Sequence, residues 1–328
     1  MPTRLLVQEP SGIVERPPED LSELRDRPCW LDVADPASRE IDLIASELGL
    51  HPLAVEDAKH RHQRPKIEEY GSPRSAASGP PGASGHYFIV FYAVERDGQG
   101  LRFHELSIFI ARNVMVTVRE GDFAARAAVE KRWREGRIGD VGMLLHALLD
   151  GIVDGYFPIA DDLDEAVDEL EATIVEEQRR DFQGPLRNLF RVKRQLVMLR
   201  QRVAPQREVL AVLARGDLGF FEREERVYFE DVYDHVIRVT DEIDTFRDLA
   251  SNVIDAHLAA ASNRLNEVMK VLTSVATVLL VVSVITGFFG MNFAALPQTS
   301  PQWFWATTAV IALVTVGLFI YFRRLGWL

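Results

Sequence analysis

Cysteine is almost absent from this chain, because Cys29 is the only one in 328 residues. One thiol excludes a disulfide framework and any zinc site built from cysteine pairs. A basic excess is also lacking: 37 Lys and Arg residues stand against 49 Asp and Glu residues, a formal net charge of −12. Nucleic-acid binders are typically basic, so we expect no nucleic-acid partner. An acidic surface suits a protein that handles cations, although simple solvation is its commoner explanation.

Enzyme motifs are missing as well. The chain contains no P-loop, no dinucleotide fingerprint and no G-x-S-x-G elbow, so ATP-driven transport and hydrolysis lack support and we expect no enzymatic activity. The N-terminal stretch MPTRLLVQEPSG has no apolar run long enough for a secretory signal. We therefore expect the N-terminal part to stay in the cytosol.

Charged residues are absent between Val271 and Phe322, in a chain that is 26% charged. Two apolar segments in this stretch, 271–290 and 303–322, each approach the ~20 residues that a transmembrane helix requires. The link 291–302 contains two prolines, which end a helix and predict a turn. The sequence therefore predicts a transmembrane hairpin, and a buried hairpin of a soluble protein is the weaker alternative.

Basic residues close both ends of this hairpin. Lys270 precedes the first span, and Arg323 and Arg324 follow the second. By the positive-inside rule both ends are cytoplasmic. We expect a multi-pass protein of the inner or plasma membrane, with a cytoplasmic N-terminus and a cytosolic C-terminal tail at 323–328.

The rest of the chain has two regions. In the first, β-rich runs (WLDV, HYFIVFYAV, LSIFIA, VMVTV) alternate with helical ones, and a Gly- and Ser-rich loop at 71–85 interrupts them. In the second, an acidic helix at 161–177 and a basic helix at 186–215 should pack antiparallel. We predict an α+β fold with three parts: a cytosolic α/β domain (1–138), a long helical funnel or stalk (139–265) and a transmembrane domain (266–328).

A seam of small and polar residues follows the helix that enters the membrane. Alternating steps of four and three residues average about 3.5, so the selected positions share one helix face. The positions between them carry valine and leucine instead. The seam consists of Asp255, Ala259, Ser262, Asn266, Met269, Thr273, Ala276, Leu280, Ser283, Gly287 and Gly290.

The seam predicts a pore, because polar groups in lipid face a bundle interior or a water-filled cavity. Close packing of helices through small residues is the alternative. Two spans cannot enclose a water path, so a pore requires an oligomer in which each seam residue forms a ring.

The stretch SNRLNEVMKVLTSVATVLLVVSVITGFFGMNF closely resembles the first transmembrane helix and Gly-Met-Asn signature of the CorA-type magnesium transport proteins. Three further segments, 51–70, 196–210 and 228–258, resemble the family in the same order. The resemblance implies a homopentamer with a funnel-shaped cytosolic part, a pore lined by the first transmembrane helix of each subunit, and magnesium as the transported and regulatory ion. Cobalt and nickel are alternative substrates.

The resemblance also implies roles for individual residues. The selectivity filter at the periplasmic mouth would consist of Gly290, Met291 and Asn292. A ring of Asn292 amide oxygens can hold a hydrated magnesium ion, which sheds its water reluctantly, without binding it too tightly to leave. The implied pore-lining residues are Asn266, Met269, Leu272, Leu280, Ser283 and Gly287; the seam itself favours Thr273 over Leu272.

Carboxylates supply the implied cytosolic metal sites. Asp231 matches an inter-subunit regulatory magnesium site, whose other half falls near Glu95 or Asp97, and Asp255 matches a ring at the cytoplasmic pore entry. The sequence departs from the family pattern at three positions: Val281 replaces a proline, Phe289 a tyrosine and Gln298 a glutamate. The missing glutamate leaves the mouth without a fixed negative ring.

Two other interpretations remain open. A ZntB-like zinc transporter shares the fold, although the intact Gly-Met-Asn signature argues against it, and a membrane-anchored scaffold would have a seam of plain aliphatic residues. A separate group could be taken for a metal cluster, but its spacing suits no standard site and we favour a structural role: His51, Glu56, Asp57, His60 and His62.

Overall fold

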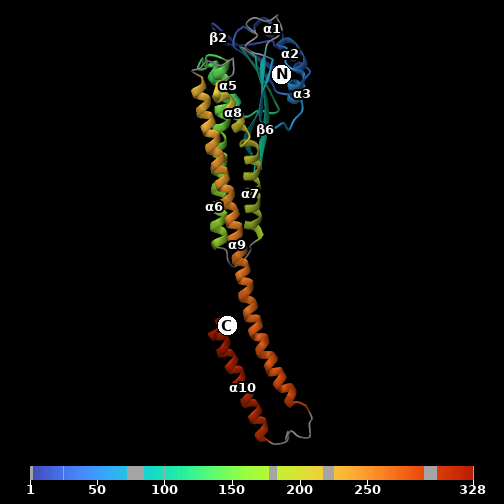
Figure 1. Ribbon diagram of the computed structural model, residues 1–328, viewed down its shortest axis with the longest axis vertical. Coiled ribbons are helices and arrows are strands. Elements are labelled where there is room, and N and C mark those ends of the chain that lie inside the picture. Colours follow the sequence, from blue (N-terminus) through green and yellow to red (C-terminus); the bar gives the residue numbers. More distant parts are fainter. Residues whose placement is uncertain are drawn as a thin grey trace. The chain divides into compact units, whose positions relative to one another are not determined.

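The computed structural model describes residues 3–24, 26–71, 85–98, 100–111, 113–176, 183–216, 225–291 and 301–327. It divides into two compact units, Met1–Ser251 and Asn252–Leu328. The predicted fold class is confirmed, since a mixed sheet is followed by long helices and two apolar C-terminal helices (Figure 1). Most of the predicted loop at 71–85 lies outside the described residues.

A seven-stranded sheet organises the first unit, in the order β2-β1-β3-β7-β6-β5-β4. All neighbouring strands are antiparallel except β3 and β7, which are parallel. The strands are β1 (Thr3–Glu9), β2 (Gly12–Arg16), β3 (Cys29–Val33), β4 (Lys66–Tyr70), β5 (His86–Asp97), β6 (Gly100–Ala111) and β7 (Val114–Arg119).

Helices follow and flank the sheet. They are η1 (Pro18–Asp20), α1 (Leu21–Leu24), α2 (Glu40–Leu48), α3 (Pro52–Lys59), α4 (Ala124–Arg134), α5 (Val141–Asp154), α6 (Tyr156–Glu176), α7 (Gln183–Val203), α8 (Gln206–Arg215), α9 (Arg226–Phe289) and α10 (Pro301–Arg324). The expected single helix at 186–215 is therefore two helices. Pro205 separates them, because it lacks the backbone N–H that a continuous helix needs.

Both faces of the sheet are buried, as the alternation of side chains along β3 shows. Leu31 and Val33 belong to a core that also contains Ile44 of α2 and Val55 of α3. Trp30, on the other face, packs on Trp133 of α4 with ring centroids 6.1 Å apart. A strand covered on both sides reads as a continuous apolar run, which is how these strands stand out in the sequence.

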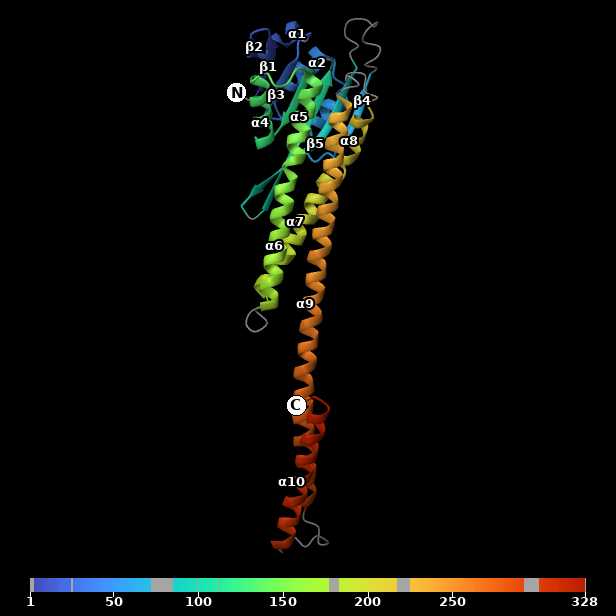
Figure 2. The same ribbon diagram turned by 90° about the vertical axis from the view of Figure 1, so that its left-hand side faces the viewer.

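Long helices continue the first unit away from the sheet. Helices α6, α7 and the first part of α9 lie side by side in both ribbon views (Figures 1 and 2). Buried residues at steps of three and four, such as Phe229, Val232, Val236 and Val239 of α9, form the packed stripe. The acidic α6 and basic α7 do pack on each other, and Arg200 of α7 also forms an ion pair with Asp244 of α9, at 2.5 Å.

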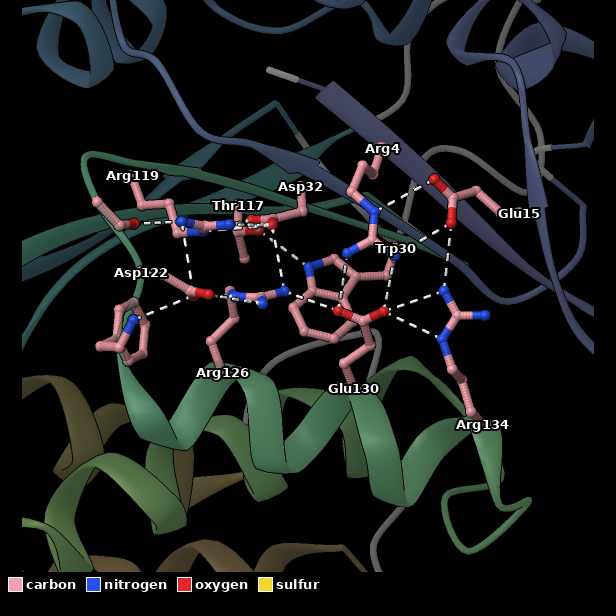
Figure 3. Close-up of polar contacts among 12 residues, drawn as sticks. Arg4, Glu15, Trp30, Asp32, Thr117, Arg119, Asp122, Arg126, Glu130 and Arg134 are labelled. Carbon is pink, nitrogen blue, oxygen red and sulfur yellow. Dashed lines mark hydrogen bonds and ion pairs between the residues drawn. The ribbon is translucent and has the colours of Figure 1, made fainter. Parts of the chain in front are cut away.

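A network of ion pairs with a buried centre at Asp32 holds α4 against the sheet (Figure 3). The Asp32 carboxylate, 3% exposed, accepts hydrogen bonds from Thr117 (2.8 Å) and from Arg119 (2.7 Å for its closest nitrogen) and lies 3.5 Å from Arg126. Trp30 Nε1 donates to the Thr117 hydroxyl at 2.9 Å. Four guanidinium groups and four carboxylates balance in charge across the network: Arg4, Arg119, Arg126, Arg134, Glu15, Asp32, Asp122 and Glu130.

Hydrogen bonds within this network keep the Glu130 carboxylate ionised. Burial alone would raise the pKa of Glu130, but hydrogen bonds from Arg4, Arg126 and Arg134 outweigh it and lower the pKa to about 2. A carboxylate with a lowered pKa adds stability above its ordinary pKa and loses that contribution as the pH falls toward the lowered value. The network is therefore intact at neutral pH.

We expect Asp32→Asn to lower the free energy of unfolding of the first unit by about 3 to 5 kcal/mol, because it leaves two buried guanidinium groups short of a counter-charge. The control is Glu9→Gln, which removes a surface pair with Arg16 and should cost less than ~1 kcal/mol. Urea unfolding of the full-length protein in detergent, followed by tryptophan fluorescence, measures both. Equal decreases in the free energy of unfolding of the two variants would show that the network stabilises the protein no more than a surface ion pair does.

Candidate functional site

Three helical stretches among the described residues are long and apolar enough to cross a membrane. In Val141–Thr173, 61% of the most apolar window is buried inside the protein, which makes it a core segment of the first unit. The corresponding windows of α9 and α10 are 6% and 0% buried. Of the three stretches, only α9 and α10 therefore leave their apolar windows almost entirely uncovered by the chain itself.

The two helices of the second unit each have one partly covered face. On α9 this face contains Ser274, Val278, Val282 and Ile285, and on α10 it contains residues such as Ile311. Both ribbon views place α10 beside the C-terminal part of α9 (Figures 1 and 2). The covered faces are where the two helices of a hairpin meet.

The seam lies on the opposite face of α9. At about 100° per residue, Met269, Leu280 and Gly287 point roughly 180° away from the face centred on Val278. All eleven seam residues are exposed, including Met269 at 56% and Leu280 at 64%. The chain thus leaves its small and polar face free of its own hairpin partner. Close packing within one hairpin does not explain the seam.

Whether Leu272 or Thr273 lines the predicted pore stays open, because both side chains are exposed and they lie on either side of the seam's axis. Helix α9 runs unbroken through Val281, where the family pattern has a proline. At its end, the Gly290 N–H donates to Thr286 O at 2.8 Å and the Met291 N–H to Phe288 O at 3.3 Å. Asn292 and Gln298 lie outside the described residues.

One group of potential metal ligands occurs in the first unit. Ligand atoms of Asp150 on α5 and of Asp231 and His235 on α9 lie within 4.8 Å of one another, and no other such group occurs among the described residues. His235 Nε2 is 3.9 Å from Asp231, and its Nδ1 is 3.7 Å from Asp154. Burial, and next the charge of Asp154, raises the pKa of Asp150 above its ordinary value.

The chemistry of this group fits a divalent cation. Two carboxylates offer the oxygens that Mg²⁺ prefers, and an imidazole suits Co²⁺, Ni²⁺ or Zn²⁺. His235 Nδ1 is buried and makes no hydrogen bond within the part of the chain that the structure describes. Asp231 is predicted as a metal ligand from the sequence, whereas Asp150 and His235 are not. His235 follows one helical turn later, whereas Asp150 is distant in the chain and has no local signal.

A surface salt bridge does not account for Asp231. Its two nearest arginines along α9 have other partners: Arg226 pairs with Glu230 at 2.9 Å and Arg238 with Glu242 at 3.1 Å. The Asp231 carboxylate is 66% exposed, and among the described residues its ion-pair partner is His235, at 3.9 Å.

The other predicted metal ligands lie apart from this group within one chain. Glu95 accepts a hydrogen bond from the Ala124 N–H at the start of α4 (2.8 Å) and lies 3.3 Å from His104 Nε2. Asp97 pairs with Arg102 at 2.6 Å near the β5–β6 turn. Asp255 is exposed at the N-terminal end of the seam.

The histidine-rich stretch 51–62 serves local structure. His51 Nδ1 accepts from the Leu53 N–H at 3.3 Å and so caps α3, while Asp57 pairs with Lys66 at 2.7 Å. His60 Nδ1 lies 2.9 Å from Glu56 O, and the His62 N–H donates to Glu105 at 2.6 Å. These bonds support the structural interpretation.

The fold and the seam define a class: proteins that join a mixed α/β unit through one very long helix to an apolar helical hairpin. The model of the family described as CorA-like Mg²⁺ transporter protein matches residues 25–324. The chain belongs to this family. It is therefore a membrane protein of a metal-ion transporter family.

Individual relatives agree with this assignment. The cobalt/magnesium transport protein CorA of Thermotoga maritima is 31% identical over 309 residues, covering 92% of this chain and 84% of the relative. The complete structure of the CorA magnesium transporter from Methanocaldococcus jannaschii has a TM-score of 0.81 at 23% identity, covering 100% of this chain and 99% of the other. The ZntB cytoplasmic domain from Vibrio parahaemolyticus has a TM-score of 0.64 at 9% identity, covering 79% and 98%.

We expect single cysteines at Ser283 and Gly287 to react with water-soluble thiol reagents in membranes, because the seam is free of the hairpin partner. Cysteines at Val278 and Val282, on the face toward α10, should not react. Cys29 can remain, since burial raises its pKa to about 12 and suppresses its thiolate. Equal labelling of the two pairs would contradict a water-facing seam.

Proposed function

We propose that the chain forms a homopentamer that conducts Mg²⁺ across the inner or plasma membrane into the cytosol, with both termini cytoplasmic. The observation that carries this proposal is the uncovered seam of α9, which leads directly to Gly290 and Met291. Family membership supports a divalent cation as the substrate. Co²⁺ and Ni²⁺ are further candidate substrates, and no chemical reaction is assigned to the chain.

Symmetry turns the seam into a pore. With α9 innermost and α10 outside it, each seam residue becomes a ring, and the apolar outer positions face lipid. Met269 and Leu272 form the hydrophobic gate, while Asn266, Thr273, Leu280, Ser283 and Gly287 line the path. At the mouth, Asn292 amide oxygens and backbone carbonyls hold the ion with its water, so it binds without being trapped.

We expect Asn292→Ala to abolish or severely reduce Mg²⁺ uptake into liposomes while leaving the oligomer intact. Without acidic residues in the 291–302 link, amides are the strongest side-chain oxygens there, and Asn292 is the one that directly follows Gly290 and Met291. Gln302→Ala, which removes a similar amide at the start of α10, is the matched control and should transport normally. Undiminished uptake by the Asn292 variant would refute the filter.

The same assay separates the ion choices. The fold likeness to the ZntB domain at 9% identity says nothing about the ion. Competition of Mg²⁺ uptake by Co²⁺, Ni²⁺ and Zn²⁺ orders the substrates. A protein that transports Zn²⁺ and excludes Mg²⁺ would support the zinc alternative.

The metal group at Asp231 provides the proposed regulation. Each chain carries a formal charge of −12, so the cytosolic parts of a ring of copies repel one another. Divalent ions bound at Asp231, with Asp150 and His235 of the same chain and Glu95 or Asp97 of a neighbour as candidate partners, offset that repulsion and favour the closed ring. When cytosolic Mg²⁺ falls, these sites empty and the equilibrium shifts toward the open pore.

We expect Asp231→Lys to make protease protection of the cytosolic part largely independent of Mg²⁺, because a fixed cation replaces the bound one. Asp168→Lys, which places the same charge on an exposed position of α6, should keep the Mg²⁺ dependence of the natural protein. Limited proteolysis over a Mg²⁺ series measures both. If the Asp231 variant needs as much Mg²⁺ as the natural protein, the regulatory role is wrong.

A further inference from the structure

The C-terminal end of α10 closes with a complete capping turn, and we call residues 322–327 the capped end. Gly326 adopts a left-handed conformation (φ +69°) that only glycine takes up readily, and it turns the chain back. The Trp327 N–H donates to Phe322 O at 3.0 Å and the Gly326 N–H to Arg323 O at 3.2 Å, which is the pair of bonds of the Schellman motif. The Trp327 ring stacks on Phe322 with centroids 5.8 Å apart and supplies the apolar contact that accompanies this motif.

The capped end lies against α9, within the second unit. Phe322, 6% exposed, is the only buried residue of α10, and Ser274, 0% exposed, is the only buried residue of α9 between 258 and 289. Trp327 borders a hollow whose other walls are α9 residues between 263 and 273. Both ribbon views bring the end of α10 beside this part of α9 (Figures 1 and 2). The capped end is therefore the segment that covers Ser274.

Ser274 suits a close contact between two membrane helices. Small residues let helix backbones approach one another in lipid. The Ser274 hydroxyl donates to Lys270 O at 2.8 Å, so its burial leaves no polar group without a partner. Val278 and Val282 on the same face stay partly exposed. The hairpin thus buries α9 most completely at the level of Ser274.

This level is also that of the proposed gate. Leu272 and Met269 precede Ser274 by two and five residues, within roughly one and a half helical turns. At about 100° per residue, their side chains point more than about 130° away from Ser274. The contact at Ser274 therefore supports the gate segment, 269–273, from the side of α9 opposite to the gate side chains.

We propose that Trp327 is a positioning residue for the gate: by holding Phe322 against Ser274, it fixes the rotation of the gate segment and favours the closed pore. Opening requires the gate side chains to leave the axis, through a bend or a rotation of α9, and either movement breaks the contact at Ser274. The contact stabilises only the closed state, so it shifts the closed–open equilibrium by that difference. The inference rests on the gate and the Mg²⁺-dependent closure of the proposed function.

The test measures currents through the full-length protein in liposomes against the Mg²⁺ concentration on the cytosolic side. In Trp327→Ala, the concentration that half-closes the pore should rise roughly three- to tenfold, as the loss of one aromatic pair predicts, while the current without cytosolic Mg²⁺ stays unchanged. Trp327→Phe keeps a ring on Phe322 and should close like the natural protein. The matched control is Trp305→Ala, which removes a 70% exposed tryptophan from the other end of α10 and should not shift closure. Unchanged closure in Trp327→Ala refutes the proposal.

Gly326 offers a second pair of variants. Asparagine tolerates the left-handed conformation and a β-branched residue does not, so Gly326→Asn should close normally and Gly326→Val should need more Mg²⁺. A Cβ at Gly326 would meet no atom within 4 Å, so the backbone conformation and not a clash separates the two variants. If Trp327→Ala fails to assemble, this pair decides, and equal closure by both Gly326 variants overturns the proposal.

Amide hydrogen exchange, followed by mass spectrometry on the same samples, tests the contact without relying on transport. Residues 268–276 should exchange faster in Trp327→Ala than in the natural protein, and residues 284–289 should not. Unchanged exchange at 268–276 refutes the contact itself. Faster exchange with unchanged closure shows that the capped end only anchors a helix end, which refutes the positioning role. A natural protein that conducts but does not close with Mg²⁺ refutes the proposed regulation, while the exchange still reports on the contact.

Discussion

A polar helix face cannot remain against hydrocarbon, and this constraint connects the second unit to the proposed function. Burying hydroxyl groups without partners in lipid costs free energy, so Thr273 and Ser283 must face protein or water. The chain's own α10 covers the opposite face of α9. In the proposed assembly other copies of the chain enclose the seam, and a symmetric ring of copies would enclose it as a water path rather than as a dry contact.

The first unit has to accommodate many charged side chains in a chain with more acidic than basic residues. It does so by pairing: the network around Asp32 is charge-balanced and buried at its centre, and it fixes α4 on the sheet. Asp231 differs from the carboxylates of this network, since the arginines nearest to it along the helix pair with other residues. The proposed regulatory site thus lies at a carboxylate that pairs with no arginine or lysine among the described residues.

Much of this structure was predictable from local patterns, and the exceptions have physical causes. Hydropathy alone located both apolar helices, and a 3.5-residue step located the seam that α10 leaves uncovered. Pro205 marked the break between α7 and α8 in the sequence, but the basic periodicity on both sides of it suggested one helix. Asp150 joins Asp231 only through the contact of α5 with α9, which leaves no periodic trace in the sequence.

The central claim is that α9, with its seam inward, forms the wall of a pore built from several copies. Cryo-electron microscopy of the full-length protein in lipid nanodiscs tests it most directly. The account predicts a five-fold ring in which α9 is innermost, Met269 and Asn292 face the axis and α10 contacts lipid. A ring with α10 innermost, or a hairpin that remains monomeric in the bilayer, would contradict it.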